Sequence, residues 1–227
     1  MILIDEWMAG LTTRLKDTFG ARLLFVGLQG SYRRGEANES SDIDAVVILD
    51  MLSRDDLKAY REMIESMPES NKACGFISGK QELMNWPKHE LFQFKNDTLA
   101  LYGSLDMLLP EIFREDIVDS IKIGASGLYH SCCHTYIHAE KVSLSDALRG
   151  FYKGAFFILQ GLHYLRGGEY IGSKKELMLR LEGAEREILE VGMGWAGYAD
   201  TITANPDIYF EKMIGWCSGI LADTQLV

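Results

Sequence analysis

The sequence lacks the features that mark secreted and membrane-spanning proteins. The first residues, Met1–Glu6, contain no basic segment followed by a long apolar stretch, so we expect no signal peptide. The most apolar stretch, residues 155–165, is too short to cross a membrane and is interrupted by Gln160, Gly161 and His163. Internal repeats and low-complexity segments are also absent from the sequence.

Cysteine is scarce and shows no pattern of pairing. The adjacent residues Cys132 and Cys133 would point to different faces of a helix, and Cys74 and Cys217 lie far from them in the sequence. This spacing does not resemble the disulfide framework of a secreted domain. The sequence therefore predicts free thiols and a cytoplasmic location.

Positive charge is in deficit. Lys and Arg number 23 against 33 Asp and Glu, which gives a net charge of -10. Nucleic-acid partners are held largely by Lys and Arg contacts to phosphates, so this balance argues against them. It is compatible with a cationic small substrate, with carboxylates that bind metal, or simply with a solvated surface.

The pattern of apolar residues along the sequence changes near residue 105. Before Gly103, apolar runs predict short strands alternating with helices; after it, helical periodicity dominates to the end. We therefore divide the chain into an α/β domain, residues 1–105, and a helical domain, residues 106–227. The expected strands are 22–28, 43–49, 74–78, 90–94 and 98–102, and the expected helices are 2–19, 54–67, 111–141, 145–167, 174–192 and 207–222.

One segment of the first domain carries groups suited to phosphate and metal binding. Gly30-Ser31 follows the first apolar strand, and Asp42 and Asp44 open the next one. Residues two apart on a strand share a face, so both carboxylates can bind Mg²⁺, which prefers oxygen ligands. The Gly-Ser turn offers backbone N–H groups and a hydroxyl to phosphate oxygens. The sequence predicts a phosphate cradle, to which Arg33 adds charge, facing a divalent-metal site.

The order strand, Gly-Ser, ten residues, Asp-x-Asp, apolar strand resembles the DNA polymerase β-like nucleotidyltransferase superfamily in its small bacterial, kanamycin nucleotidyltransferase-like form. The likeness includes Ser41-Asp42-Ile43-Asp44, covers residues 22–103 well and extends more loosely to the helical half. It implies an α+β fold: a small mixed sheet with flanking helices, followed by an all-α helical bundle. It also implies Mg²⁺-dependent transfer of a nucleoside monophosphate, AMP from ATP or the equivalent from another NTP, to the hydroxyl of a small-molecule acceptor. An aminoglycoside-like acceptor would suit the acidic composition.

The resemblance assigns roles to individual residues. Asp42 and Asp44 would bind the metal, and a third carboxylate on a neighbouring strand would complete the site or accept the proton of the attacking hydroxyl. We prefer Glu90 for this position because it opens an apolar run, whereas Asp97 follows Lys95-Asn96 and has the surroundings of a turn residue. The nucleotide-binding residues implied in this domain are Gly30, Ser31, Arg33 and Ser41.

The helical half contributes further candidates. The resemblance makes Glu140 a candidate general base and Lys153 a candidate phosphate contact, with surface charge as the alternative for both. His130, His134 and His138 recur one helical turn apart. Such histidines can chelate zinc, but this stripe has no separate ligand pair and could equally face the active site or pack with tyrosines.

Three questions stay open at the level of sequence. The acceptor could instead be a protein side chain, as in antitoxin members of the superfamily. The fold could also be retained as a nucleotide-binding module without chemistry. A homodimer is a further alternative, because related enzymes build composite sites across two chains.

Overall fold

The computed structural model describes residues 2–140 and 144–226, and the chain forms two compact units, Met1–Glu111 and Ile112–Val227. The boundary between the two units lies six residues after the domain boundary at residue 105 that the pattern of apolar residues predicted. Within the described residues, no helix is both long enough and apolar enough to cross a membrane.

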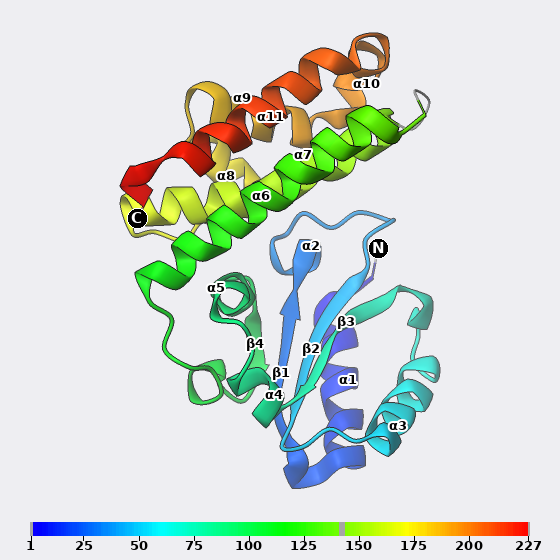
Figure 1. Cartoon of the computed structure of the whole chain (residues 1–227). Helices are drawn as coiled ribbons and strands as arrows, with labels where there is room; N and C mark the ends of the chain where they lie inside the picture. The colour runs from blue at the N-terminus through cyan, green and yellow to red at the C-terminus, as the bar shows by residue number, and fades with distance from the viewer. Residues whose placement is uncertain (1, 141–143, 227) are drawn as a thin grey trace. The chain divides into compact units, whose positions relative to one another are not determined.

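The N-terminal unit is a small mixed sheet with helices (Figure 1). Its strands lie in the order β3-β2-β1-β4. Strand β1 is antiparallel to both β2 and β4, whereas β2 and β3 are parallel. In chain order the elements are α1 (Ile4–Phe19), β1 (Leu23–Gln29), α2 (Gly30–Arg33), β2 (Ile43–Leu49), α3 (Arg54–Glu65), β3 (Ala73–Gly79), α4 (Lys80–Met84), α5 (Lys88–Asn96) and β4 (Leu99–Tyr102).

The two faces of the sheet pack against different helices. Odd-numbered residues of β2, such as Ala45 and Val47, join a buried cluster with α1 and the end of α3. Even-numbered residues point to the opposite face, because side chains alternate along a strand. On that face Phe76 of β3, the register partner of Val46, contacts the ring of Phe94 on α5 with centroids 5.0 Å apart. Asp44 therefore belongs to the face that α5 covers.

One predicted strand is wrong: residues 90–94 lie in helix α5. The apolar run Leu91-Phe92-Gln93-Phe94 is short, and a run of this length fits a buried strand or a helix equally well. Pro87 immediately precedes the helix and Glu90 lies in its first turn, and both features favour a helix start. The strands predicted at 22–28, 43–49, 74–78 and 98–102 are confirmed within one residue at their ends.

The described residues of the C-terminal unit form helices and no strands, in agreement with the predicted α+β class. The predicted helix 174–192 is wrong as one element: it is broken before Gly183, which has a φ of +54°. The loop expected between the last helices contains a further helix that begins at Trp195. The elements are α6 (Arg114–His138), α7 (Leu144–Gly167), α8 (Lys174–Met178), α9 (Gly183–Met193), α10 (Trp195–Ala204) and α11 (Pro206–Ala222).

Candidate active site

Gly30 and Asp44 meet at the end of the β1–β2 hairpin. Strand β1 ends at Gln29, which pairs with Asp44 in the register of the sheet. The next residue, Gly30, has a φ of +72° and opens α2. A Cβ atom at this position would lie 1.8 Å from Oδ2 of Asp44. Only glycine allows the backbone to take this conformation so close to the carboxylate.

The predicted acids Asp42 and Asp44 lie at the start of the same strand. Asp42 is exposed immediately before β2, and Asp44 is half-buried within it. Their oxygen donors suit Mg²⁺, which is commonly held by one or two carboxylates together with substrate phosphates and water. Among the described residues, no group of three or more His, Cys, Asp or Glu side chains could hold a metal ion. Metal binding by Asp42 and Asp44 therefore stays a prediction.

Glu90 is not on a strand and does not form such a group with Asp42 and Asp44. It lies on the first turn of α5 with 56% of its side chain exposed. Its Oε2 accepts a hydrogen bond of 2.6 Å from Nε1 of Trp86. The expectation of an acid on a neighbouring strand is therefore wrong for Glu90, and its catalytic role stays a prediction.

Asp97, which the sequence suggested was a turn residue, is buried beside the candidate site. It follows α5 with 7% of its surface exposed, and its Oδ2 accepts a 2.6 Å contact from Nη1 of Arg34. Burial is the main cause that raises the pKa of the Asp97 carboxyl; the positive charges of Arg34 and Arg33 oppose this rise, and the charge of Asp44 adds to it. The pair joins residues 63 apart in the chain, so no local sequence signal could have identified it.

Other contacts hold the same two segments together. Nη2 of Arg33 donates to the carbonyl of Asn96 at 3.2 Å. Nε2 of Gln29 donates to Oγ1 of Thr98 at 2.6 Å. The turn between α5 and β4 is thus attached to the end of β1 and to α2. Part of the Arg33 guanidinium that we predicted for phosphate is engaged in this attachment.

Ser31 and Ser41 both shape the connection between α2 and β2. The carbonyl of Ser31 accepts from the N–H of Glu36 at 2.8 Å. The hydroxyl of Ser41 accepts from the N–H of Asn38 at 2.9 Å. Ser31 lies in the short helix α2, next to Gly30, and its contact with phosphate stays a prediction. Ser41 instead closes a turn, and its contact with nucleotide stays a prediction.

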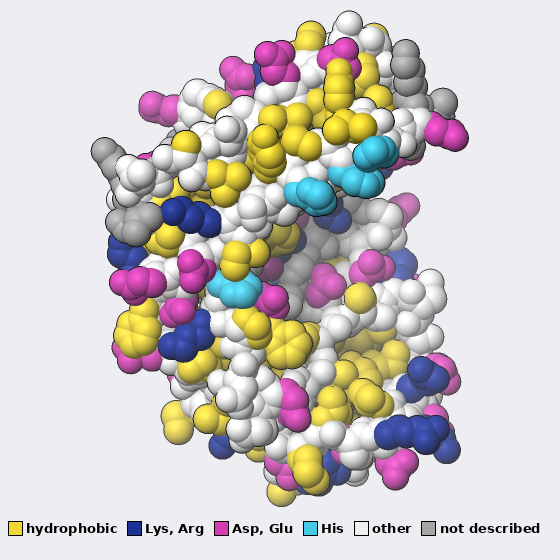
Figure 2. All heavy atoms as spheres, in the orientation of Figure 1, with side chains coloured by type: hydrophobic (Ala, Val, Ile, Leu, Met, Phe, Trp, Pro, Cys, Tyr) yellow, Lys and Arg dark blue, Asp and Glu magenta, His cyan; other side chains and the backbone are white. Residues whose placement is uncertain are grey.

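The candidates of the helical half lie in the C-terminal unit. Lys153 is exposed on α7, and Glu140 is exposed after the end of α6. Histidine side chains form a row on the surface of this unit (Figure 2). The ring centroids of His134 and His138 are 4.7 Å apart, and those of His130 and His134 are 6.1 Å apart. Because no further described ligand joins them in a metal-binding group, the row carries no metal site of three ligands.

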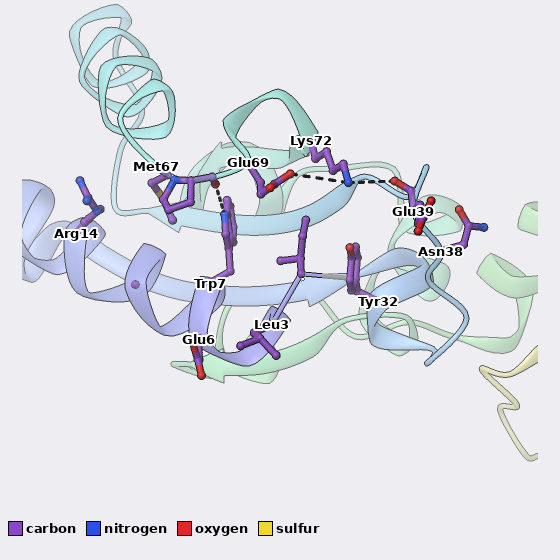
Figure 3. A pocket seen from close by; sticks show the side chains of 13 residues that line it. Leu3, Glu6, Trp7, Arg14, Tyr32, Asn38, Glu39, Met67, Glu69 and Lys72 are labelled. Carbon is purple, nitrogen blue, oxygen red and sulfur yellow. Dashed lines mark hydrogen bonds and ion pairs between the residues drawn. The ribbon is translucent and has the colours of Figure 1, made fainter.

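A separate pocket of about 490 Å³ borders the segment that joins α2 to β2 (Figure 3). Tyr32 of α2 and Asn38 and Glu39 of the following segment line this pocket. None of the predicted site residues lines it. Nζ of Lys72 donates to the carbonyl of Glu39 at 3.0 Å. The pocket therefore borders the segment between Gly30 and Asp42, but the residues predicted to bind phosphate and metal do not line it. Its other lining residues include Leu3, Glu6, Trp7, Arg14, Met67 and Glu69.

Known proteins resemble this chain in a segment of its sequence and in its fold. Residues 10–87 match the family model of the nucleotidyltransferase domain, a range that includes Gly30, Asp42 and Asp44 and ends before Glu90. No curated protein matches the chain in sequence. The chain resembles the crystal structure of spectinomycin adenyltransferase AAD(9) from Enterococcus faecialis with ATP and spectinomycin. The TM-score is 0.58 at 13% identity, and the match covers 96% of this chain and 99% of the other. The matched segment, residues 10–87, is thus similar to a nucleotidyltransferase domain, and the likeness to the solved structure shows that the two chains share a fold.

Proposed function

We propose that this protein transfers a nucleoside monophosphate, AMP from ATP, to a hydroxyl group of a cationic small molecule in the presence of Mg²⁺. The nucleotidyltransferase domain supports the reaction type. The fold shared with a spectinomycin adenyltransferase supports ATP as donor and a small acceptor of the aminoglycoside kind. The net charge of -10 favours a cationic acceptor over an anionic one.

The contact between Gly30 and Asp44 is the observation that carries the proposal. A Cβ atom added at position 30 would lie 1.8 Å from the Asp44 carboxylate. The turn proposed to bind phosphate and the acid proposed to bind metal are therefore neighbours in space as well as in sequence. A triphosphate at the start of α2 would then meet the metal carboxylates directly. This proximity would allow Asp44 to hold a metal ion close to the phosphates bound at Gly30.

Each residue has a specific task in the proposed reaction. Asp42 and Asp44 would hold Mg²⁺, which when bound would offset the negative charge of the phosphates and of the leaving pyrophosphate. The backbone at Gly30 and Ser31 orients the triphosphate, and Arg33 adds positive charge. The acceptor oxygen forms a bond to the α-phosphorus, the bond from that phosphorus to the β-phosphate oxygen breaks, and pyrophosphate leaves. The hydroxyl proton passes to a carboxylate, for which we keep Glu90 as the candidate; Lys153 is kept as a phosphate contact.

The test is mass spectrometry of a reaction with ATP, Mg²⁺ and spectinomycin or a related aminocyclitol. We expect an adenylylated acceptor, and we expect its formation to fall at least about 100-fold in the double variant Asp42→Asn/Asp44→Asn. Asp50→Asn is the matched control, because Asp50 follows the other end of the same strand and contacts Arg22 at 3.1 Å. Undiminished transfer by the double variant would disprove the proposal.

The same experiment separates the alternatives. An adenylyl group found on a protein instead of on the small molecule would assign the chain to the protein-modifying members. Calorimetric binding of ATP without product at any acceptor would identify a nucleotide-binding module without chemistry. Omitting Mg²⁺ and adding a chelator should abolish product formation.

A further inference from the structure

The pocket beside α1 has the size of a binding site for a small organic molecule. Its volume of about 490 Å³ lies in the range that such sites occupy. All of its lining residues belong to the N-terminal unit, and none of them has a role in the proposed transfer. Nε1 of Trp7 donates to the carbonyl of Pro68 at 2.7 Å, which fixes the indole ring in the wall of the pocket. The nucleotidyltransferase reaction therefore does not account for this cavity.

Three residues that line the pocket are unfavourable for local folding. Leu3 is the N-cap of α1, where an apolar side chain accepts no hydrogen bond, and it is 67% exposed. Gly10 lies inside α1, where glycine destabilises a helix relative to alanine. Glu69 has a φ of +54° and is the one non-glycine residue with a positive φ among the described residues. Such departures gather at functional sites, so their presence around one pocket favours a ligand site over an incidental gap.

The charges around the pocket favour a cationic ligand. Three acids line it, Glu6, Glu39 and Glu69, against two bases, Arg14 and Lys72. The ammonium of Lys72 is already engaged, at 3.0 Å from the carbonyl of Glu39 and 3.8 Å from the Glu69 carboxylate. The carboxylates of Glu6 and Glu39 enter no ion pair with a described residue. Two acids are thus available to an ammonium group from outside the chain.

The apolar part of the lining favours a ligand with an aromatic or similarly compact body. Trp7 and Met67 are each only 6% exposed and lie beside each other in the lining, with Tyr32 further along it. The rings of Trp7 and Tyr32 point to the same side, toward the segment that carries Glu69 and Lys72 (Figure 3). Aromatic faces bury apolar surface and also attract cations.

We infer that this pocket binds a small organic cation with an aromatic or other compact apolar body. The body packs against Trp7 and Tyr32, and the ammonium group pairs with the carboxylates of Glu6 and Glu39. The inference goes beyond the proposed function and does not depend on it, because no residue of the pocket takes part in the proposed transfer.

The first experiment compares three indoles that differ in charge. Tryptamine, indole-3-ethanol and indole-3-acetate are titrated against the full-length chain by calorimetry. We expect tryptamine to bind at least about tenfold more tightly than the neutral and the anionic compound, because its ammonium makes charge-assisted hydrogen bonds. The double variant Glu6→Gln/Glu39→Gln should remove this preference and leave the binding of indole-3-ethanol unchanged, which a loss of pocket shape would not do.

The second experiment fills the pocket. A Cβ atom at position 10 would meet nothing within 4 Å, so Gly10→Leu places its side chain in the open space without a backbone clash. We expect tryptamine binding to weaken at least about tenfold, and stability in urea to be equal or higher, because leucine favours a helix more than glycine does. Gly127→Leu is the matched control: it makes the same change inside α6, where a Cβ also meets nothing within 4 Å, and should leave binding unchanged.

The outcomes that overturn the inference are distinct from those that overturn the proposed function. Absence of measurable tryptamine binding, equal affinity for the three indoles, or undiminished binding by Gly10→Leu would overturn the inference. Loss of tryptamine binding in Asp42→Asn/Asp44→Asn would also overturn it, because the indole would then occupy the proposed active site. A chain that binds tryptamine with the expected ranking but adenylylates no acceptor contradicts the proposed function alone.

Discussion

The two ends of strand β2 both carry acidic residues, but their surroundings are opposite. At the start, Asp44 lies against the backbone of Gly30, and Asp42 is exposed beside it. Beyond the other end, Asp50 and Asp56 both contact Arg22, at 3.1 Å and 2.7 Å. The acids beyond the far end of β2 are thus held by an arginine of the chain, whereas the start of the strand places an acid beside the glycine turn that we propose for phosphate.

The acids beyond the end of β2 that lies near Arg22, here called the Arg22 end, make contacts that stabilise the fold. Asp56 is 7% exposed, receives two hydrogen bonds from Arg22 and closes the capping box of α3 with Ser53. The hydrogen bonds from Arg22, followed by those from Ser53, hold the pKa of the Asp56 carboxyl well below its usual range. Arg22 thus pairs with Asp50 and with Asp56 within the chain.

The largest expected effect comes from closing the space at Gly30. Gly30→Ala places a Cβ on the Asp44 carboxylate, and we expect nucleotide transfer to fall about 100-fold because the metal acid is displaced. Gly35→Ala is the matched control: Gly35 has a φ of +68° in the same loop, but a Cβ there would meet nothing within 4 Å.

Both glycine variants should lose about 1–2 kcal/mol in the free energy of unfolding, because both require a left-handed backbone. Transfer rates measured by mass spectrometry, together with urea unfolding, would separate strain from displacement of Asp44. Equal loss of activity in the two variants would show that backbone strain, and not the proximity of Asp44, matters at this end of β2.

The contrast between the two ends was only partly predictable from sequence. Gly30, Asp42 and Asp44 are close in the chain and flank two strands with clear apolar patterns, so the hairpin brings them together without information from distant residues. The Ser53–Asp56 cap is also local, because it joins residues three apart in the chain. The contact of Asp56 with Arg22 joins residues 34 apart and required the structure.

Residues 86–98 could not be predicted because their environment is set by distant elements. Phe94 contacts Phe76 across the sheet face, and this packing, together with Pro87, favours a helix over the strand that the apolar run suggested. Asp97 had the local features of a turn residue, and it is one. Its burial against Arg34 depends on how the α5–β4 turn meets α2, which no periodicity encodes.

A smaller effect is expected from the capping box at the Arg22 end. Ser53→Ala removes the side-chain acceptor for the N–H of Asp56 and should lower the free energy of unfolding by about 1 kcal/mol. Nucleotide transfer should not change, because Ser53 is not among the residues proposed for transfer. Ser66→Ala, at the opposite end of α3, caps no N–H group and should cost less in the same urea titration. A loss of transfer in Ser53→Ala would mean that the two ends of β2 are coupled.

The smallest expected effect is a dependence of stability on pH that belongs to Asp56. Because the pKa of its carboxyl is lower in the folded than in the unfolded state, the unfolded chain takes up the proton first as the pH falls. The stabilisation by the ionised carboxylate is therefore fully present above the unfolded pKa of about 3.9 and is lost progressively below it. In urea unfolding at pH 7, 5, 4 and 3, the stability difference between the unsubstituted protein and Asp56→Asn should stay constant from pH 7 to 5 and shrink from pH 4 to 3. A difference that grew on acidification would mean that Arg22 does not favour the ionised form of Asp56, and the acids at this end of β2 would then not owe their stabilising role to the arginine.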